Sequence, residues 1–573
     1  MCRPMKRLDQ LSSQARAQWL ALAQSHDPVV WVALGSCSQA AGADAVALAM
    51  RDELAARGCQ ARFVRTGCMG LCYLEPTAIV RKPGCARVVY GPLDENSARR
   101  LVAECLLGEG SCPDLAVGRL DADPPEDVPD LSDHPAMRLQ VRRVMQHCGL
   151  IDPEDLSHYL ANGGYEAFRQ ALAMPADEII ERLKESGLRG RSGGGFPVWR
   201  KWEFTRNAKG SQRYVLCNAH EGDPGAFSNR LLTESDPHGF LEGMLIAAFT
   251  VGATQGYIYM ASEYPLAHHR VGMAIDQLRW AGLLGDDILG SGFSFDITLR
   301  SGAGVFVSGE ETAQIASLEG RRGAPAPRPP YPGQSGIAGA PTLVQNVETL
   351  ANVPLIVAHG GEWFRAVGTS ASPGTKAFSL SGRLARRGVF ELPLGMGLSH
   401  VVNDVGGGAR DEHPLKAVHT GGPPGGLLPA DIEVPLDFDS MGETGSLMGS
   451  GGIIAIDDRC CIVDLTRHFM EFAQDEACGQ CVPCRNGNRV MLDILNRLTQ
   501  GQGRPGDLDR LLELGNVIRL TSLCGLGQTA PNPILTGIRY FRSEFEAHLH
   551  GSCPAGVCPL AAPAESVAEA AAS

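Results

Sequence analysis

The sequence predicts a multidomain α/β protein with a helical domain near its C-terminus. At about 100–200 residues per domain, its 573 residues correspond to three to five domains. Helical and strand patterns alternate with glycine-rich loops over residues 140–375, which is typical of α/β domains. Over residues 461–550, Leu, Ile and Val recur at helical spacing instead.

Composition excludes several functional classes. The net charge of −13 argues against nucleic acid as a main partner. No run of about 18 apolar residues exists, so we expect no membrane span, and the N-terminus lacks the apolar core of a secretory signal. The 18 cysteines in so long a chain predict cluster ligands and buried thiols in a reducing cytoplasm rather than a disulfide scaffold.

The first domain is expected over residues 1–108. Its apolar segments predict a β-α-β-β-β-α order, which is the pattern of a small thioredoxin-like domain. The strands are expected at 30–34, 61–65, 77–81 and 86–90, and the helices at 41–57 and 95–106. The following segment is rich in Pro and Asp, so residues 109–139 are expected to form an exposed linker.

Three glycine-containing loops predict a cofactor pocket in the domain at 140–375. The first loop starts at Gly190 and is followed by Lys201, so it offers backbone N–H groups and a cation to a phosphate. The second follows an apolar strand and carries polar residues from Asn218 to Asp223, and ligands bind at such strand ends. The third precedes Glu310 and Glu311, which also suit a helix start.

A four-cysteine pattern lies in the last domain, expected at 461–550 after a small β-rich module at 376–460. Cys478, Cys481 and Cys484 form C-x2-C-x2-C, and Cys524 follows 39 intervening residues later. Four thiolates in this arrangement favour a [4Fe–4S] cluster. Zinc is the alternative, but its sites usually use two C-x2-C pairs.

The remaining C-terminal cysteines predict no further metal site. Cys460 and Cys461 are expected in the core. Cys553 and Cys558 are too few to hold an ion, and we expect a remnant or a surface loop. Residues 551–573, rich in Ala, Pro, Glu and Ser towards the end, are expected to form a disordered tail.

Together, five long motifs resemble the NADH-binding flavoprotein subunit of respiratory complex I and its relatives in soluble hydrogenases and formate dehydrogenases. The resemblance covers about residues 140–550. It rests on GLRGRSGGGFP, CNAHEGDPGAF, GEETA, PTLVQNVETL and EACGQCVPCRNG. It implies a Rossmann-like FMN- and NAD-binding domain, a β-grasp-like domain and a helical bundle holding the [4Fe–4S] cluster.

The resemblance also implies cofactor contacts. FMN would lie against Gly190, Ser192, Lys201, Asn218, Glu221, Gly309, Asn346 and Thr349. NADH would contact Phe196, Phe204, Glu310, Glu311 and Tyr331. Core packing is an equal alternative for Phe204 and Tyr331. No catalytic side chain is expected beyond this cofactor shell.

Two residues of this region differ from the sequence pattern of complex I members, and a third predicts a preference for NAD over NADP. Ser192 stands where most complex I members have glycine, and His220 where they have aspartate, both beside the expected flavin. Glu221, if it lies near the dinucleotide, would repel a 2′-phosphate and favour NAD over NADP.

The N-terminal domain resembles the thioredoxin-like [2Fe–2S] subunit that partners this flavoprotein, here fused ahead of it. Cys37, Cys68 and Cys72 match three of that family's four ligands, but Gly42 stands at the fourth position. Cys59 and Cys85 are expected at the opposite end of the fold. Either Ser36 or Ser38 supplies an oxygen ligand, or the cluster is absent.

The fused head, Ser192 and His220 look most like the β (diaphorase) subunit of NAD-dependent formate dehydrogenases. The expected partner is therefore a larger subunit with a molybdopterin (Mo or W) centre and Fe–S clusters, in a hetero-oligomer. The alternatives are the diaphorase of a bidirectional NAD-reducing hydrogenase and a non-catalytic assembly subunit without flavin.

Overall fold

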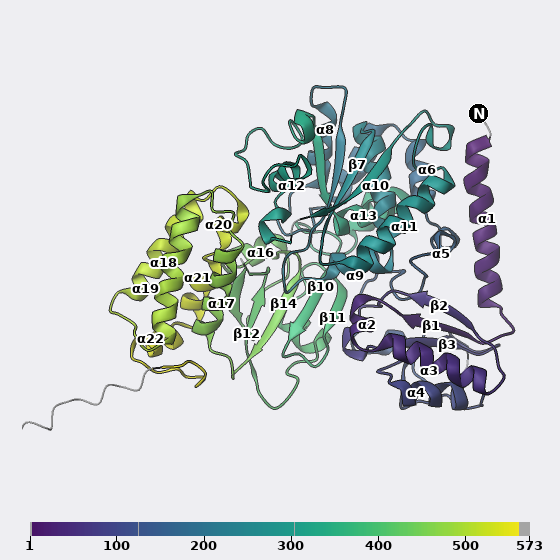
Figure 1. Cartoon of the computed structure of the whole chain (residues 1–573), viewed down its shortest axis with the longest axis horizontal. Helices are drawn as coiled ribbons and strands as arrows, with labels where there is room; N and C mark the ends of the chain where they lie inside the picture. Colours follow the sequence, from purple (N-terminus) through teal and green to yellow (C-terminus); the bar gives the residue numbers. More distant parts are fainter. Residues whose placement is uncertain (1–2, 124, 126, 303, 424, 561–573) are drawn as a thin grey trace, which may run out of the picture.

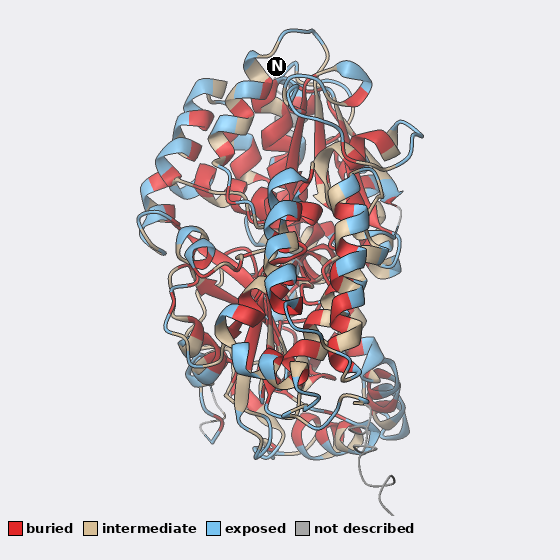
Figure 2. Cartoon of the chain, turned by 90° about the vertical axis from the view of Figure 1, so that its left-hand side faces the viewer, coloured by how far each residue is buried: buried red, intermediate tan, exposed pale blue. Residues whose placement is uncertain are grey.

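The computed structural model describes residues 3–123, 125, 127–302, 304–423 and 425–560. Figure 1 shows an N-terminal head at one end, a middle α/β domain and β-rich module at the centre, and a helical domain at the other end. None of the described helices is both long and apolar enough to cross a membrane. In Figure 2 the helices facing the viewer carry exposed residues outward and buried residues on their inner sides.

The head has the predicted thioredoxin-like order. Its sheet runs β2-β1-β3-β4-β5, with β1 parallel to β2 and antiparallel to β3. The strands are β1 (Val29–Ala33), β2 (Arg62–Thr66), β3 (Ala78–Arg81), β4 (Val88–Tyr90) and β5 (Ala116–Arg119). The helices are α1 (Arg3–Ala23), α2 (Ser36–Ala40), α3 (Ala43–Ala56) and α4 (Glu95–Arg100). Helix α1, which the sequence pattern did not predict, lies along the middle domain and contacts α5 (Leu156–Ala161).

The segment expected as an exposed linker is partly built into the head. Strand β5 pairs with β4, and Val128 and Leu131 are buried. The prediction of an exposed linker over the whole of 109–139 is therefore wrong. The few apolar side chains among the Pro and Asp residues are enough to add an edge strand to the sheet.

The middle domain has a parallel sheet of order β8-β7-β6-β9. The strands are β6 (Tyr214–Ala219), β7 (Gln255–Ala261), β8 (Asp296–Gly302) and β9 (Thr342–Asn346). Strand order reverses at β6, because β7 lies on one side of it and β9 on the other. Ligands bind at such switch points in open α/β sheets. Asn218 and Asn346 are register partners at the carboxyl ends of these strands.

Helices cover this sheet, and α10 packs on α13 beside it. They are α6 (Glu166–Leu172), α7 (Ala176–Ser186), α8 (Val198–Asn207), α9 (Ser228–Ser235), α10 (Pro237–Val251), α11 (Pro265–Ala281), α12 (Glu311–Leu318), α13 (Val347–His359) and α14 (Gly361–Arg365).

The β-rich module has the mixed order β11-β10-β14-β12-β13, with β10 parallel to β14. Its strands are β10 (Thr375–Gly382), β11 (Gly388–Pro393), β12 (Leu415–Thr420), β13 (Gly426–Pro429) and β14 (Gly452–Asp457), and its short helices are α15 (Leu398–His400) and α16 (Phe438–Glu443). Its core is shared with the head, since Met69 and Leu71 pack in the same cluster as Phe378 and Phe390.

The last domain is helical, as predicted. Its helices are α17 (Ile462–Asp475), α18 (Val482–Thr499), α19 (Asp507–Thr521), α20 (Gly525–Thr529), α21 (Asn532–Tyr540) and α22 (Arg542–Leu549). Of the expected tail, residues 551–560 form turns, and part of this segment packs on the domain through Cys553, Ala555 and Cys558. Residues 561–573, where disorder was also expected, lie outside the described residues.

Candidate functional site

A cavity of about 790 Å³ lies at the carboxyl ends of β6 and β9. Its volume is within the range of about 300–1,000 Å³ that is usual for cofactor sites. It brings together every residue predicted to contact FMN or NADH except Glu221. These residues are Gly190, Ser192, Phe196, Lys201, Phe204, Asn218, Gly309, Glu310, Glu311, Tyr331, Asn346 and Thr349.

Glycines leave room along one wall. Among the described residues, and apart from its chain neighbours, a Cβ built at Gly194 would meet no atom within 4 Å, and one at Gly190 would come no closer than 3.6 Å to any. Gly193 has a φ of +115° and a Cβ there would lie 2.7 Å from Gly449, so this position requires glycine. Asn218 ties the end of β6 to the third glycine loop, because its side-chain N–H donates to the Gly309 carbonyl oxygen at 2.9 Å.

Charged side chains of both signs line the cavity. Lys201 Nζ lies 2.9 Å from Glu311, and Arg328 contacts the other Glu311 oxygen at 2.8 Å. Burial alone would raise the pKa of Glu311, but these two cations outweigh it and hold the pKa below its usual range. Glu310 caps α12 by accepting the N–H groups of Thr312 and Ala313. The helix-start role foreseen for the acidic pair therefore applies to Glu310.

Three aromatic side chains stand exposed at the cavity. Phe196 is 43% exposed, and Phe204 and Tyr331 are each 55% exposed. Core packing is therefore excluded for Phe204 and Tyr331. Large rings left in water beside a cavity are available for stacking on a planar ligand.

Glu221 is the predicted site residue that the structure does not bring to the cavity. Its carboxylate is buried and accepts the N–H groups of Asn229 at 3.0 Å and Arg230 at 2.9 Å, so it caps α9. The prediction that its charge faces the dinucleotide is wrong, because both oxygens face α9 instead. His220 also lies behind the wall, with its Nε2 2.9 Å from the Val305 carbonyl oxygen, and burial lowers its pKa.

The donor set fits FMN and a dinucleotide. Glycine backbone and Lys201 suit phosphate, and the exposed rings suit an adenine. The side-chain nitrogen of Gln345, which is buried and lines the cavity, has no hydrogen-bond partner among the described residues. Such a buried amide requires a partner, and a cofactor in this cavity supplies one.

The Cys478 motif lies against this cavity. Cys481 precedes α18, Cys484 lies on it, and Cys524 precedes α20. Gly525, the residue after Cys524, lines the cavity. Two of the four cysteines, Cys478 and Cys524, pack in one apolar cluster with Phe306, Val307 and Leu526.

The surroundings of these sulfurs suit a cationic cluster. The Leu523 N–H lies 3.4 Å from Cys481 Sγ and the Asn488 amide 3.5 Å from Cys484 Sγ, as N–H···S contacts. Burial, together with the neighbouring sulfurs, raises the pKa of Cys484 to about 12. Its thiolate form therefore requires a nearby cation, which cluster irons provide.

The structure also assembles the three head cysteines. Cys72 Sγ lies 4.0 Å from both Cys37 Sγ and Cys68 Sγ. Cys59 and Cys85 do not belong to this group, as predicted, and Gly42 begins α3 without a side chain to offer.

Helix α9 covers this cysteine group. Ser36 donates its hydroxyl to Glu234 at 2.5 Å and its N–H at 2.9 Å, so its side chain is held towards Glu234. Ser38 is fully buried next to Cys37 and Glu75. Of the two candidate oxygen ligands, Ser38 is therefore the better placed.

Cys461 is buried in the core, as predicted, but it also belongs with His548, Cys553 and Cys558 to one group of potential metal ligands. The prediction that Cys553 and Cys558 form only a remnant or a surface loop is wrong, because both lie in this group. Sequence spacing missed the group since Cys461 lies 87 residues before His548.

Comparison with known proteins agrees with this geometry. Residues 183–355 match the Nuo51 FMN-binding domain, and residues 464–548 match the NADH-ubiquinone oxidoreductase-F iron–sulfur binding region. The HndC subunit of the NADP-reducing hydrogenase of Solidesulfovibrio fructosivorans is 48% identical over 421 residues, which is 73% of this chain and 86% of that one. The F 2 subunit of the NADH-quinone oxidoreductase of Rhizobium meliloti is 42% identical over 414 residues, covering 72% and 98%.

A solved structure extends the similarity to the head. A chain of an NAD+-reducing [NiFe]-hydrogenase in the H2-reduced state aligns with a TM-score of 0.63 and 29% identity, covering 95% of this chain and 91% of that one. Fold, cavity and cysteine motif define a flavin- and iron–sulfur-containing oxidoreductase subunit. The chain belongs to the family of NADH-quinone oxidoreductase and hydrogenase subunits that carry the Nuo51 FMN-binding domain.

Proposed function

We propose that this chain is a diaphorase subunit that exchanges a hydride between NAD(H) and FMN and passes single electrons to or from a partner subunit. The observation that carries the proposal is the contact between the cavity and the cysteine cage at Gly525. Bound FMN supplies the step from two-electron to one-electron chemistry. Cys478, Cys481, Cys484 and Cys524 would hold the [4Fe–4S] cluster beside it.

The residues of the cavity then have distinct roles. Gly190, Ser192 and Lys201 would hold the flavin phosphate, and Asn218, Gly309, Asn346 and Thr349 would orient the flavin. Phe196, Phe204 and Tyr331 would stack on the adenine of NADH, and Glu310 and Glu311 would meet its nicotinamide-ribose end. Positioning of the two reacting rings is the protein's contribution, so no acid–base side chain is required.

We still propose that the chain uses NAD rather than NADP, but the charge of Glu221 does not support this choice. Glu221 contributes no charge to the cavity, because its carboxylate faces α9. A cytoplasmic location likewise stays a prediction.

The head is proposed to carry a [2Fe–2S] cluster on Cys37, Cys68 and Cys72, with Ser38 as the fourth ligand. The convergence of the three sulfurs within 4.8 Å, the burial of Cys68 and the separation of Cys59 and Cys85 from the group support this assignment.

For the partner we propose a larger formate-oxidising subunit with a molybdopterin (Mo or W) centre. Ser192 and His220 support this choice. The fused head does not support a formate partner over a hydrogenase partner. The NAD+-reducing hydrogenase chain aligns over 95% of this chain, so the alignment extends into the head. A hydrogenase partner is the second candidate, favoured by that same alignment. A flavin-free assembly subunit is disfavoured, because all the predicted FMN and NADH contacts except Glu221 line the cavity.

Purification of the native complex separates these possibilities. Flavin absorbance with broad iron–sulfur absorbance, and NAD+ reduction that depends on formate, are expected. Reduction that depends on H2, with nickel bound and no response to formate, would reject the formate partner but not the diaphorase. A colourless, folded chain would reject the diaphorase itself.

A further inference from the structure

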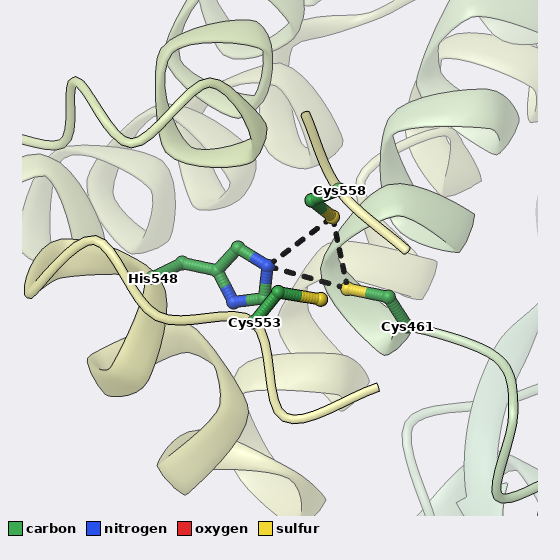
Figure 3. A group of neighbouring side chains, drawn as sticks. All are labelled: Cys461, His548, Cys553 and Cys558. Atoms are coloured by element: carbon green, nitrogen blue, oxygen red, sulfur yellow. Dashed lines mark hydrogen bonds between the residues drawn. The ribbon is translucent and has the colours of Figure 1, made fainter. Parts of the chain in front are cut away.

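A third group of metal-ligating side chains lies at the far end of the helical domain, away from the cavity. Cys461 comes from the start of α17, His548 from the end of α22, and Cys553 and Cys558 from the segment that follows. Figure 3 shows the four side chains converging on one point. Cys461 and His548 are buried, and the other two are half-buried.

The distances match the edges of a single coordination tetrahedron. Cys461 Sγ and Cys558 Sγ lie 3.6 Å apart, and each lies 3.4 Å from His548 Nε2. All four ligand atoms lie within 4.8 Å of one another. Zinc–sulfur bonds of about 2.3 Å and zinc–nitrogen bonds of about 2.0 Å give edges of about 3.8 Å between sulfurs and about 3.5 Å from sulfur to nitrogen.

The histidine is already oriented for metal binding. Its Nδ1 lies 2.7 Å from the carbonyl oxygen of Glu544, so Nδ1 carries the proton and Nε2 presents its lone pair to the sulfurs. The Glu544 carboxylate in turn accepts the Ile462 N–H at 3.1 Å and pairs with Lys416 at 3.0 Å. One residue therefore fixes both the imidazole and the start of the helix that follows Cys461. The N–H of Asp464 lies 3.4 Å from the Cys461 sulfur.

The ligand types argue against a cubane cluster. A [4Fe–4S] cluster is held by four Cys thiolates, whereas this group has three thiolates and one imidazole. Three thiolates and one imidazole make the Cys3His set of structural zinc sites, which are closed and leave no position for substrate.

We propose that Cys461, His548, Cys553 and Cys558 bind one structural Zn²⁺. The ion joins the start of α17, the end of α22 and the segment 551–560. Because α17 leads to Cys478, the ion anchors the far end of the helix that precedes the [4Fe–4S] cage.

The direct test is metal analysis of the full-length chain purified with its clusters and without added zinc. About one zinc per chain is expected in addition to cluster iron. Zinc-edge X-ray absorption should show three sulfurs at about 2.3 Å and one nitrogen at about 2.0 Å. A zinc that had replaced cluster iron in the Cys478 cage would show four sulfurs instead, which would overturn the proposal, as would absence of zinc.

Variants give an independent test. Cys553→Ser with Cys558→Ser should abolish bound zinc and lower the melting temperature, while leaving iron content near the wild-type value. Cys460→Ser is the matched control, because Cys460 adjoins Cys461 but its sulfur faces Asp457 instead of the group. It should keep its zinc. Undiminished zinc in the double variant would overturn the assignment.

Thiol titration of the wild-type chain keeps the test open if the double variant fails to fold. A mercurial reagent should release zinc as it consumes about three thiols per ion. A disulfide between Cys461 and Cys558, found by mass spectrometry under anaerobic purification, would reject the zinc site.

Discussion

At the scale of the residue, predictions were correct for side chains that a strand end positions and wrong for a side chain that a loop positions. Asn218 and Asn346 end neighbouring parallel strands, so sheet topology alone brings them together. Glu221 lies three residues beyond Asn218, yet its partners are the amides of Asn229 and Arg230. Those contacts depend on how the chain turns after β6, and no residue pattern specifies that turn.

The exposed rings give a prediction at this scale. Phe204→Ala should raise the KM for NADH by about tenfold, since loss of ring stacking costs on the order of 1–1.5 kcal/mol. The melting temperature should stay unchanged, because the Phe204 side chain is 55% exposed. Steady-state kinetics with a small dye acceptor measure the first quantity, and calorimetry the second.

Trp280→Ala is the control for this variant. Trp280 is 64% exposed and does not line the cavity. An equal KM in Phe204→Ala and wild type would show that Phe204 does not contact the dinucleotide.

At the scale of the element, contacts between modules were not predictable. His419 on β12 stacks on Phe469 of α17 with ring centroids 4.0 Å apart and an interplanar angle of 16°. The β-rich module and the helical domain were each predicted from the sequence, but this contact joins residues 50 positions apart across the two. Burial without a hydrogen-bond partner among the described residues lowers the pKa of His419 to about 3.

This buried imidazole predicts acid sensitivity. Its folded-state pKa lies below the ordinary value of 6.5, so the unfolded chain binds more protons and stability falls as pH drops through 6.5 towards 3. At pH 5 the loss attributable to His419 is about 2 kcal/mol. His419→Phe, which keeps a ring on Phe469, should reduce the decrease in melting temperature between about pH 7.5 and about pH 5.

His468→Gln serves as the comparison, because His468 lies on the same helix as Phe469 with its side chain 60% exposed. It should lose stability with acid as wild type does. Identical pH profiles for His419→Phe and wild type would mean that another group governs acid unfolding.

At the scale of the whole molecule, the three sites follow one another from head to helical domain. The head cysteines lie under α9, whose start is capped by Glu221 from the loop after β6. The cavity lies at the carboxyl end of the sheet that contains β6. Gly525, which follows the cage residue Cys524, lines this cavity. The head cysteines, the cavity and the cage were each predicted from their own motifs. Their order in the molecule could not be predicted, because it arises from packing between domains.

Electron flow through this order is tested by Cys481→Ser. A serine oxygen is a poor iron ligand, and three thiolates cannot complete a cubane, so the variant should lose about four irons per chain and the corresponding low-temperature EPR signal. NADH-dependent reduction of a small dye at the flavin should persist, because it precedes the cage. Reduction of NAD+ by the partner's substrate in the complex should be lost.

Cys59→Ser, which alters a thiol of the head outside both cysteine groups, should keep all these activities. Full iron content in Cys481→Ser would show that Cys481 is not a ligand, and loss of dye reduction together with the cluster would show that the cavity depends on the cage for its structure.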